Sequence, residues 1–302
     1  LKLPTVKHLT PAAKQALMCF LISNLTFIVC FLTGVLGSSS ELWALKYWGP
    51  ALYFCLINFV LKYCYKGFIY EVSIRASGLG AAMAVGMYLV SFNNGWKVFG
   101  LYAVALTFFH FSEFVAVALS NPKTVTIDSF ILNHSVQYTA AAVASWVEWA
   151  VEYYFFPDLK THFWLSSLGV VMCLGGELLR KTAMFTAKHN FTHTVQFVKR
   201  PEHQLVTHGV YSLCRHPSYV GWFYWSIGTQ IILLNPICVF VYALASWMFF
   251  RERVYAEEMT LLAFFGIQYD EYQKKVGTGL PFILGYVPEN RRQNLKEDHW
   301  SY

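Results

Sequence analysis

The chain has 302 residues, of which 56% are hydrophobic and only 13% are charged, and its net charge is +6. A soluble domain carries about 25% charged residues, and a water-soluble chain of this length could not bury so much apolar surface in one core. Composition therefore predicts an all-α integral membrane protein. The basic residues lie between apolar runs instead of in dense clusters, which argues against nucleic acid as a partner.

The apolar runs predict about eight transmembrane helices. The first six are poor in charge, with Glu113 inside the fourth, and cover residues 15–40, 47–61, 76–96, 98–122, 129–152 and 161–176. Residues 216–250 then carry no charge at all. As one helix this run would be about 52 Å long, against a hydrocarbon core of about 30 Å. Asn235-Pro236 in its middle predicts a tight turn between two shorter helices.

The positions of the charges predict the orientation. With eight spans both termini lie on one side, and if that side is cytosolic, all but three of the 23 Lys and Arg residues are cytosolic. The three exceptions, Lys46, Lys97 and Lys160, fall in three different lumenal loops. We therefore expect a multi-pass protein with cytosolic termini. Residues 1–160 form an N-terminal part with little polar chemistry, and residues 161–302 form a C-terminal part rich in polar groups.

The densest polar stretch runs from residue 196 to residue 221. Pro217, directly before an apolar run, suits the first turn of a helix. Ser218 and Tyr219 would then lie at a helix N-terminus, where free amides and the helix dipole favour an anionic group, and Gly221 allows close backbone approach. A solvated loop before an ordinary helix is the alternative, and the pattern favours a ligand site.

A second polar cluster follows the last apolar run, at residues 251–258. On a continuing helix Arg253 and Glu257 share one face. They are either a surface ion pair or a partly buried pair beside the first cluster. Of the other acidic residues, Glu113 is open to two interpretations, a functional group or one satisfied by neighbouring helices. Glu177 can pair locally with Arg180 or Lys181.

Four further residues are weaker candidates for chemistry. Glu148 and Glu152 are expected near the lumenal surface. His189 and His193 have a helical metal-ligand spacing, but membrane oxygenases use several histidine boxes, so we expect no metal site.

The two polar clusters and the sequence around them resemble the isoprenylcysteine carboxyl methyltransferases, which are eight-span enzymes of the endoplasmic reticulum. The match runs from about residue 196 to about residue 281. It includes Gly-Val-Tyr-x-x-x-Arg-His-Pro-Ser-Tyr-Val-Gly-Trp at 209–222, Arg-x-x-x-Glu-Glu at 253–258 and Thr-Gly-Leu-Pro-Phe at 278–282. The resemblance implies that Arg253 binds the substrate and acts in catalysis. It also implies contacts with S-adenosylmethionine from Gln196, His203, Gln204, Leu205, Val206, Tyr211, His216, Pro217, Ser218, Tyr219 and Glu257.

The implied reaction methylates the C-terminal carboxylate of a prenylated cysteine in CaaX-processed proteins and releases S-adenosylhomocysteine. A terminal carboxylate is ionised at neutral pH, so orientation and desolvation can suffice without a general base. We expect the loop from 181 to 217 to cap the cofactor from the cytosol. The prenyl group, farnesyl or geranylgeranyl, would enter from membrane lipid between the apolar helices of the first half.

Two other classes of function stay open at this point. Membrane sterol reductases that use NADPH end in a related Arg-His-Pro-x-Tyr segment. A lipid transporter or receptor would be the non-enzymatic alternative, although transporters tend to place ionisable groups at the membrane midplane and often have repeated halves. Here the polar residues gather at one rim, which favours the methyltransferase.

Overall fold

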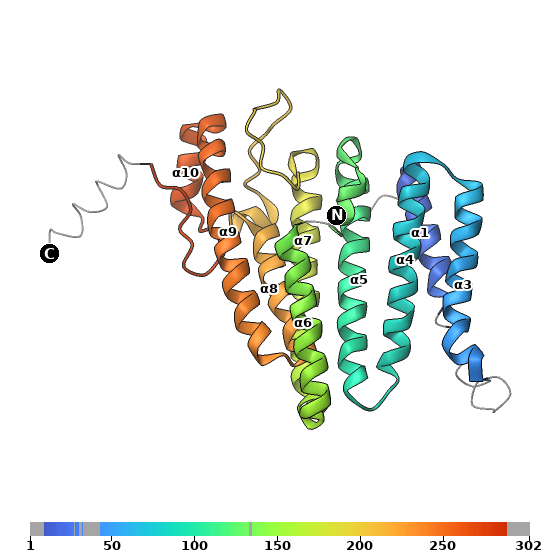
Figure 1. Cartoon of the computed structure of the whole chain (residues 1–302). Helices are drawn as coiled ribbons and strands as arrows, with labels where there is room; N and C mark the ends of the chain where they lie inside the picture. The colour runs from blue at the N-terminus through green and yellow to red at the C-terminus, as the bar shows by residue number, and fades with distance from the viewer. Residues whose placement is uncertain (1–8, 27, 30–31, 33–42, 133–134, 289–302) are drawn as a thin grey trace.

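The computed structural model describes residues 9–26, 28–29, 32, 43–132 and 135–288. This part of the chain is helical and contains no strand (Figure 1). Its α-helices are α1 (Pro11–Asn24), α3 (Trp43–Cys64), α4 (Gly67–Val90), α5 (Gly95–Ser120), α6 (Val136–Phe155), α7 (Phe163–Ala187), α8 (Pro217–Leu233), α9 (Pro236–Phe265) and α10 (Ile267–Lys275). The predicted all-helical fold is thus confirmed.

Three helices, α4, α5 and the α7 region through Asn190, are long and apolar enough to cross a membrane by length and composition. The membrane character is therefore supported, while the count of eight spans stays a prediction. The predicted first segment, 15–40, begins within α1, and most of its second half lies outside the described residues. The fifth begins later than predicted, at Val136, after a 3-10 turn at Ile127–Phe130.

The long helices lie side by side in a row, with α1, α3 and α4 at one edge and α9 and α10 at the other (Figure 1). α7 and α8 make the most extensive contact among the described helices, in part through facing glycines. A Cβ atom on Gly176 would lie 2.5 Å from the carbonyl oxygen of Gly221, and one on Gly169 would lie 2.8 Å from that of Gly228. Only glycine allows the two backbones to meet in this way. The close contact brings the end of α7 beside the start of α8, as expected for Gly221.

The predicted turn at Asn235-Pro236 is confirmed. α8 ends at Leu233, Leu234 adopts a left-handed conformation with φ of 58°, and Pro236 begins α9. Lys160 lies under this turn, completely buried, and its Nζ donates to the carbonyl oxygens of Leu233 and Leu234, each at 2.9 Å. Lys160 does lie in the connection between α6 and α7, as expected, and it is buried there because the carbonyls at the end of α8 need a donor.

Two glutamates of α6 complete this turn. Glu152 forms an ion pair with Lys160 at 2.6 Å. Glu148 accepts hydrogen bonds from the backbone amides of Ile237 and Cys238, both at 2.7 Å, and so caps the start of α9. The sequence predicted only that both glutamates lie near the lumenal surface. In the structure both carboxylates also hold the hairpin between α8 and α9.

Candidate active site

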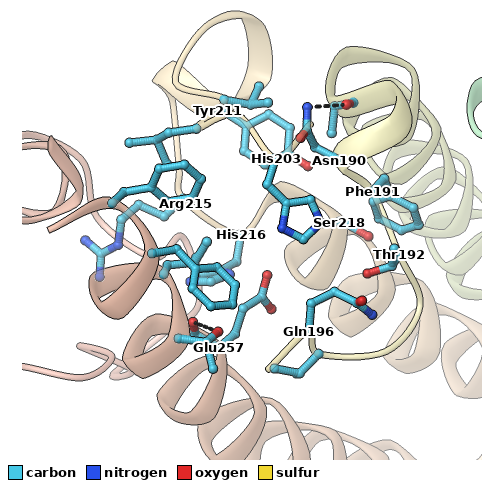
Figure 2. Close-up of a pocket in the computed structure, with 18 of the residues that line it drawn as sticks. Asn190, Phe191, Thr192, Gln196, His203, Tyr211, Arg215, His216, Ser218 and Glu257 are labelled. Carbon is cyan, nitrogen blue, oxygen red and sulfur yellow. Dashed lines mark hydrogen bonds between the residues drawn. The ribbon is translucent and has the colours of Figure 1, made fainter. Parts of the chain in front are cut away.

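A cavity of about 140 Å³ opens where α7 ends, α8 begins and α9 ends. Figure 2 shows Gln196, His203 and Glu257 around this space, contributed by the connection between α7 and α8 and by α9. All eleven residues named above as expected cofactor contacts line it, namely Gln196, His203, Gln204, Leu205, Val206, Tyr211, His216, Pro217, Ser218, Tyr219 and Glu257. The expected contact residues, which are spread between positions 196 and 257 of the sequence, thus line one shared cavity.

The start of α8 forms one wall of this cavity. His216 occupies the N-cap position and Pro217 the first helical position, as predicted, since proline needs no amide partner there. The ring of His216 stacks on Tyr219, with centroids 5.4 Å apart, and its Nε2 lies 3.0 Å from Oε1 of Glu258. Ser218 accepts a hydrogen bond of 2.7 Å at its Oγ from Arg180 of α7. These contacts fix the first turn of α8 in place.

Behind that turn lies a buried charged network centred on Glu113 of α5, which is fully buried. Arg180 binds both of its carboxylate oxygens, at 2.6 and 2.8 Å, Nε2 of His193 lies 2.9 Å from Oε2, and Lys181 also contacts it. We considered Glu113 either as a functional group or as one satisfied by neighbouring helices. The structure shows that neighbouring groups do satisfy its charge. Glu177 pairs with Lys181 at 3.0 Å, as one of the two expected partners. The network ties α5, α7 and the following connection to the cavity wall.

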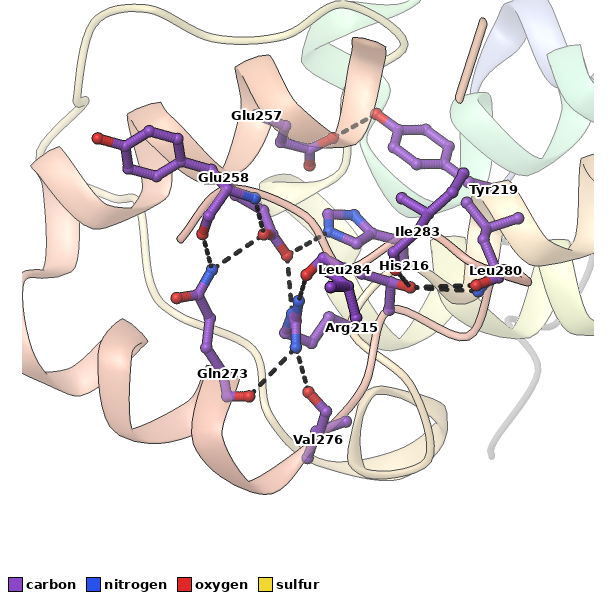
Figure 3. Close-up of polar contacts among 12 residues, drawn as sticks. Arg215, His216, Tyr219, Glu257, Glu258, Gln273, Val276, Leu280, Ile283 and Leu284 are labelled. Carbon is purple, nitrogen blue, oxygen red and sulfur yellow. Dashed lines mark hydrogen bonds and ion pairs between the residues drawn. The ribbon is translucent and has the colours of Figure 1, made fainter. Parts of the chain in front are cut away.

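Two adjacent glutamates of α9 face in different directions (Figure 3). Glu257 lines the cavity and accepts a hydrogen bond from the Tyr219 hydroxyl. Glu258 is fully buried on the other side, where it pairs with Arg215 at 2.7 Å and accepts from the Gln273 amide at 2.9 Å. Successive residues of a helix point about 100° apart, so one carboxylate can serve the cavity while its neighbour holds the fold.

Arg253 lies beside the cavity without being part of its lining. Its Nε donates to the Tyr219 hydroxyl at 3.2 Å, and its Nη2 donates to the backbone carbonyl of His193. The Tyr219 hydroxyl therefore links Arg253 to Glu257. The sequence-based expectation that Arg253 and Glu257 share a face of one helix is confirmed, and their common contact is this tyrosine.

The connection between α7 and α8 covers the cavity over residues 188–216. The predicted cap began at residue 181, but residues 181–187 are the last turns of α7. Asn190 Oδ1 accepts from the amide of Gln204 at 2.9 Å, and Lys199 Nζ donates to the carbonyl oxygen of Phe264 at 2.5 Å. His189 and His193, considered above as a metal spacing, lie in this segment, and His193 contacts Glu113 instead.

Burial tunes two ionisable groups of the connection. It raises the pKa of Tyr211, and the nearby Glu257 carboxylate adds to the shift, so the hydroxyl stays protonated and can donate. Burial and the neighbouring Arg200 lower the pKa of His203, so its imidazole is neutral at neutral pH. A neutral imidazole beside the cavity adds no repulsion toward a cationic ligand.

Further lining residues escaped the sequence analysis. Thr260, Leu261 and Phe264 follow Glu257 at helical spacing, so the face they share with it was available as a signal. Arg215 belongs to the Arg-His-Pro-Ser-Tyr motif quoted above but was not assigned to the site. No comparable pattern singles out the remaining ones, which are Ala187, Asn190, Phe191, Thr192, Thr194, Val195, Phe265 and Tyr272.

A second cavity of about 390 Å³ lies between α5, α6, α8 and α9. Its lining is mainly apolar and aromatic and includes Leu106, Ala142, Trp222, Trp225 and Phe249. Residues of both halves of the chain contribute to it.

The two cavities adjoin along α8 and α9. On α8, Tyr219 lines the first cavity and Trp222, three residues later, lines the second. On α9, Phe250 lines the second and Glu257 the first, with Arg253 between them on the same helix. The rings of Tyr219 and Phe250 stack across this boundary, with centroids 5.2 Å apart. Arg253 therefore lies where the two cavities come together.

Comparison with known proteins gives a consistent result. The sequence model of the isoprenylcysteine carboxyl methyltransferase (ICMT) family matches residues 169–263. A protein-S-isoprenylcysteine O-methyltransferase from Tribolium castaneum is 52% identical over 92% of this chain and 99% of its own length. One from Homo sapiens is 52% identical over 78% of this chain and 84% of its own.

Among solved structures, that of the eukaryotic intramembrane Ras methyltransferase ICMT without a monobody is similar with a TM-score of 0.88. It is 50% identical in sequence, and the match covers 92% of this chain and 100% of that one.

Proposed function

The chain belongs to the isoprenylcysteine carboxyl methyltransferase family, and from this membership we propose the reaction it catalyses. A methyl group passes from S-adenosylmethionine to the C-terminal carboxylate of a prenylated cysteine in CaaX-processed proteins. The C–O bond of the methyl ester forms as the S–CH₃ bond breaks, and S-adenosylhomocysteine leaves. The charge pattern supports a site on the cytosolic side of the membrane, and the family resemblance implies that this membrane is the endoplasmic reticulum.

One observation carries this proposal: a cavity with charged and polar lining residues and a mainly apolar cavity adjoin beside an arginine. The substrate joins a lipid chain to a carboxylate, and the second cavity offers the lipid chain a volume of about 390 Å³. Volumes of about 300–1,000 Å³ are usual for small-molecule sites. Arg253, at the boundary, suits the carboxylate, since a guanidinium binds a carboxylate by two parallel hydrogen bonds.

The residues of the first cavity fit S-adenosylmethionine, which supplies an electrophilic methyl group on a sulfonium. The first turn of α8 at Ser218 suits the carboxylate of its amino-acid portion, because a helix N-terminus favours anions. The Glu257 carboxylate can accept from the ribose hydroxyls or the amino group. Phe264 and Phe265 offer an apolar surface for the base.

The chain's own residues then need only to position the prenylcysteine carboxylate relative to the methyl group and to remove water from the reacting oxygen. Arg253 holds the carboxylate of the prenylcysteine, and the Tyr219 hydroxyl fixes Arg253 relative to Glu257. The connection over residues 188–216 keeps water away from the reacting oxygen. No group has to remove a proton, because the carboxylate is already ionised. Arg253 acts by orientation, since a tighter grip on the carboxylate would lower its nucleophilicity.

The prenyl group takes the second cavity from the side of the membrane. Ala142 of α6 and Ala245 of α9 both line this cavity. Their small side chains leave room between the two helices, and Ala245 is itself exposed. When a farnesyl or geranylgeranyl chain occupies this cavity, the carboxylate of the cysteine that carries it can reach Arg253.

A methyl-transfer assay with the purified protein in lipid nanodiscs tests the proposal. With radiolabelled S-adenosylmethionine and N-acetyl-S-farnesylcysteine, we expect a labelled product that releases its label as methanol in base. N-acetylcysteine without the prenyl chain is the control and should stay unlabelled. Calorimetry with S-adenosylhomocysteine and NADPH separates the alternatives. No labelled ester, together with binding of NADPH alone, would end the case for methyl transfer.

A further inference from the structure

The segment that follows α10 returns along the molecule instead of leaving it. In Figure 1 it descends beside α9, in the darkest red. Trp247 of α9 donates from Nε1 to the carbonyl oxygen of Pro281 at 2.8 Å, which fixes how far the segment reaches. Trp247 lies four residues, about 6 Å of helix, to the apolar side of Arg251, and residues 236–250 carry no charge. The segment therefore reaches the level where α9 becomes entirely uncharged.

The inner side of the segment is part of the protein core. Leu280 and Ile283 are 5% exposed and pack with residues of α8 and α9, namely Val220, Phe223, Phe250 and Val254. Phe223 lies six residues into α8 from Pro217. Contacts with α8 and contacts with α9 thus both place residues 280–283 beside the uncharged parts of these helices.

Six backbone carbonyl oxygens of the segment accept hydrogen bonds from within the protein. The donors are Arg215, His216, Trp247 and the Thr278 side chain, and they serve the carbonyl oxygens of Val276, Gly277, Thr278, Pro281, Ile283 and Leu284. Non-helical backbone can lie at membrane depth only if protein groups supply its hydrogen bonds. Six carbonyl oxygens between residues 276 and 284 meet that condition.

Two large apolar side chains point outward from this segment. Phe282 is 95% exposed and Leu284 is 81% exposed. Phe282 also has a φ of 59°, a conformation that bulky residues rarely adopt. In water this residue would combine a strained backbone with a solvated aromatic ring. Beside lipid the same exposure is favourable, because lipid is as apolar as the ring.

We propose that Phe282 and Leu284 form a wedge that inserts among the acyl chains of phospholipids next to α9. The neighbouring surface of α9 supports lipid as the partner, since Phe240, Leu244 and Met248 form an exposed apolar stripe at four-residue spacing. The wedge continues this stripe toward the polar end of the helix.

The wedge is coupled to the start of α8 and to the buried face of α9. Arg215 donates to the carbonyl oxygen of Leu284 at 3.0 Å and pairs with Glu258, and the amide of Tyr286 also donates to Glu258 at 2.8 Å. Insertion of the wedge therefore holds the first turn of α8, and with it the first cavity, at a fixed depth relative to the lipid.

Photocrosslinking in phosphatidylcholine nanodiscs tests the wedge directly. We would prepare Phe282→p-benzoylphenylalanine, with Leu284→p-benzoylphenylalanine as a second position on the same surface. After irradiation, mass spectrometry of the peptides identifies what each residue touched. We expect phosphatidylcholine adducts at both positions.

Two phenylalanines of similar exposure calibrate the result. Phe240, 76% exposed on α9, should give lipid adducts, and Phe197, 73% exposed in the connection above the site, should give none. The proposal is overturned if residues 282 and 284 behave like residue 197, or if both crosslink to protein instead of lipid.

Discussion

Tyr219 is the residue through which the two ends of the proposed reaction are held together. Its hydroxyl donates to Glu257, which faces the first cavity, and accepts from Arg253 at the boundary with the second. The ring itself is fixed by stacking on His216 and Phe250. Removal of the hydroxyl alone should therefore loosen Arg253 without disturbing the packing.

Tyr219→Phe should lower kcat/KM for methyl transfer by about 10-fold to 100-fold. A hydrogen bond to a charged group contributes about 1.5–3 kcal/mol, and 1.4 kcal/mol corresponds to a factor of ten. Steady-state kinetics with varied prenylcysteine analogue measures the change, and the thermal unfolding midpoint should move by little. Unchanged kinetics would show that the hydroxyl does not position Arg253.

The neighbours Glu257 and Glu258 offer a matched pair of substitutions. Glu257→Gln should weaken the binding of S-adenosylhomocysteine in calorimetry and leave the unfolding temperature nearly unchanged. Glu258→Gln should mainly lower the unfolding temperature, because it leaves Arg215 without its partner. Breaking a buried pair costs about 3–5 kcal/mol of stability. Equal effects of the two substitutions on binding and on unfolding would contradict the separate roles assigned to them.

Among the helices, α7 departs most from what the sequence predicts. The apolar run ends at residue 176, where charges begin, yet the helix continues to Ala187. Arg180 and Lys181 remain inside because Glu113, on another helix, balances them. A pairing between helices leaves no pattern in a local stretch of sequence. Apolar periodicity could therefore predict where the helices lie, while the end of this one depended on a distant partner.

The hairpin between α8 and α9 depends on Lys160. We expect Lys160→Met to destabilise the protein by about 3 kcal/mol, because the carbonyl oxygens of Leu233 and Leu234 and the Glu152 carboxylate would lose their buried donor. Thermal unfolding in detergent measures the loss. Lys123→Met is the control, since Lys123 is exposed, and surface substitutions usually change stability by less than about 0.5 kcal/mol. Equal midpoints for the two variants would contradict the role of Lys160.

α6 offers a test of the route by which the prenyl group enters. Ala142 lines the apolar cavity, whereas Ala140, two residues earlier on α6, is exposed and does not line it. Ala142→Phe should raise KM for the prenylated substrate without weakening S-adenosylhomocysteine binding, because it fills part of the cavity. Ala140→Phe should change neither quantity. Equal losses for substrate and cofactor in Ala142→Phe would count against this route.

At the scale of the whole molecule, the fold brings together a cavity lined by both polar and apolar groups and a second cavity whose lining is mainly apolar. The sequence could predict the first one, because its residues are concentrated between 196 and 257 and the resemblance to a family identified them. The apolar cavity was foreseen only as a route among helices. Its walls come from α5, α6, α8 and α9, and no sequence pattern states which faces of four separate helices surround one space.

Arg253→Ala tests most directly whether a carboxylate is held where the two cavities adjoin. We expect methyl transfer to a prenylcysteine analogue to fall on the order of 100-fold or more, since a charge-assisted pair is lost, while S-adenosylhomocysteine binds as before. Arg251→Ala is the control and should keep its activity. Arg251 lies two residues before Arg253, and its side chain lies over the ring of Trp247. Full activity in Arg253→Ala, or a loss of cofactor affinity as large as the loss of activity, would contradict the account.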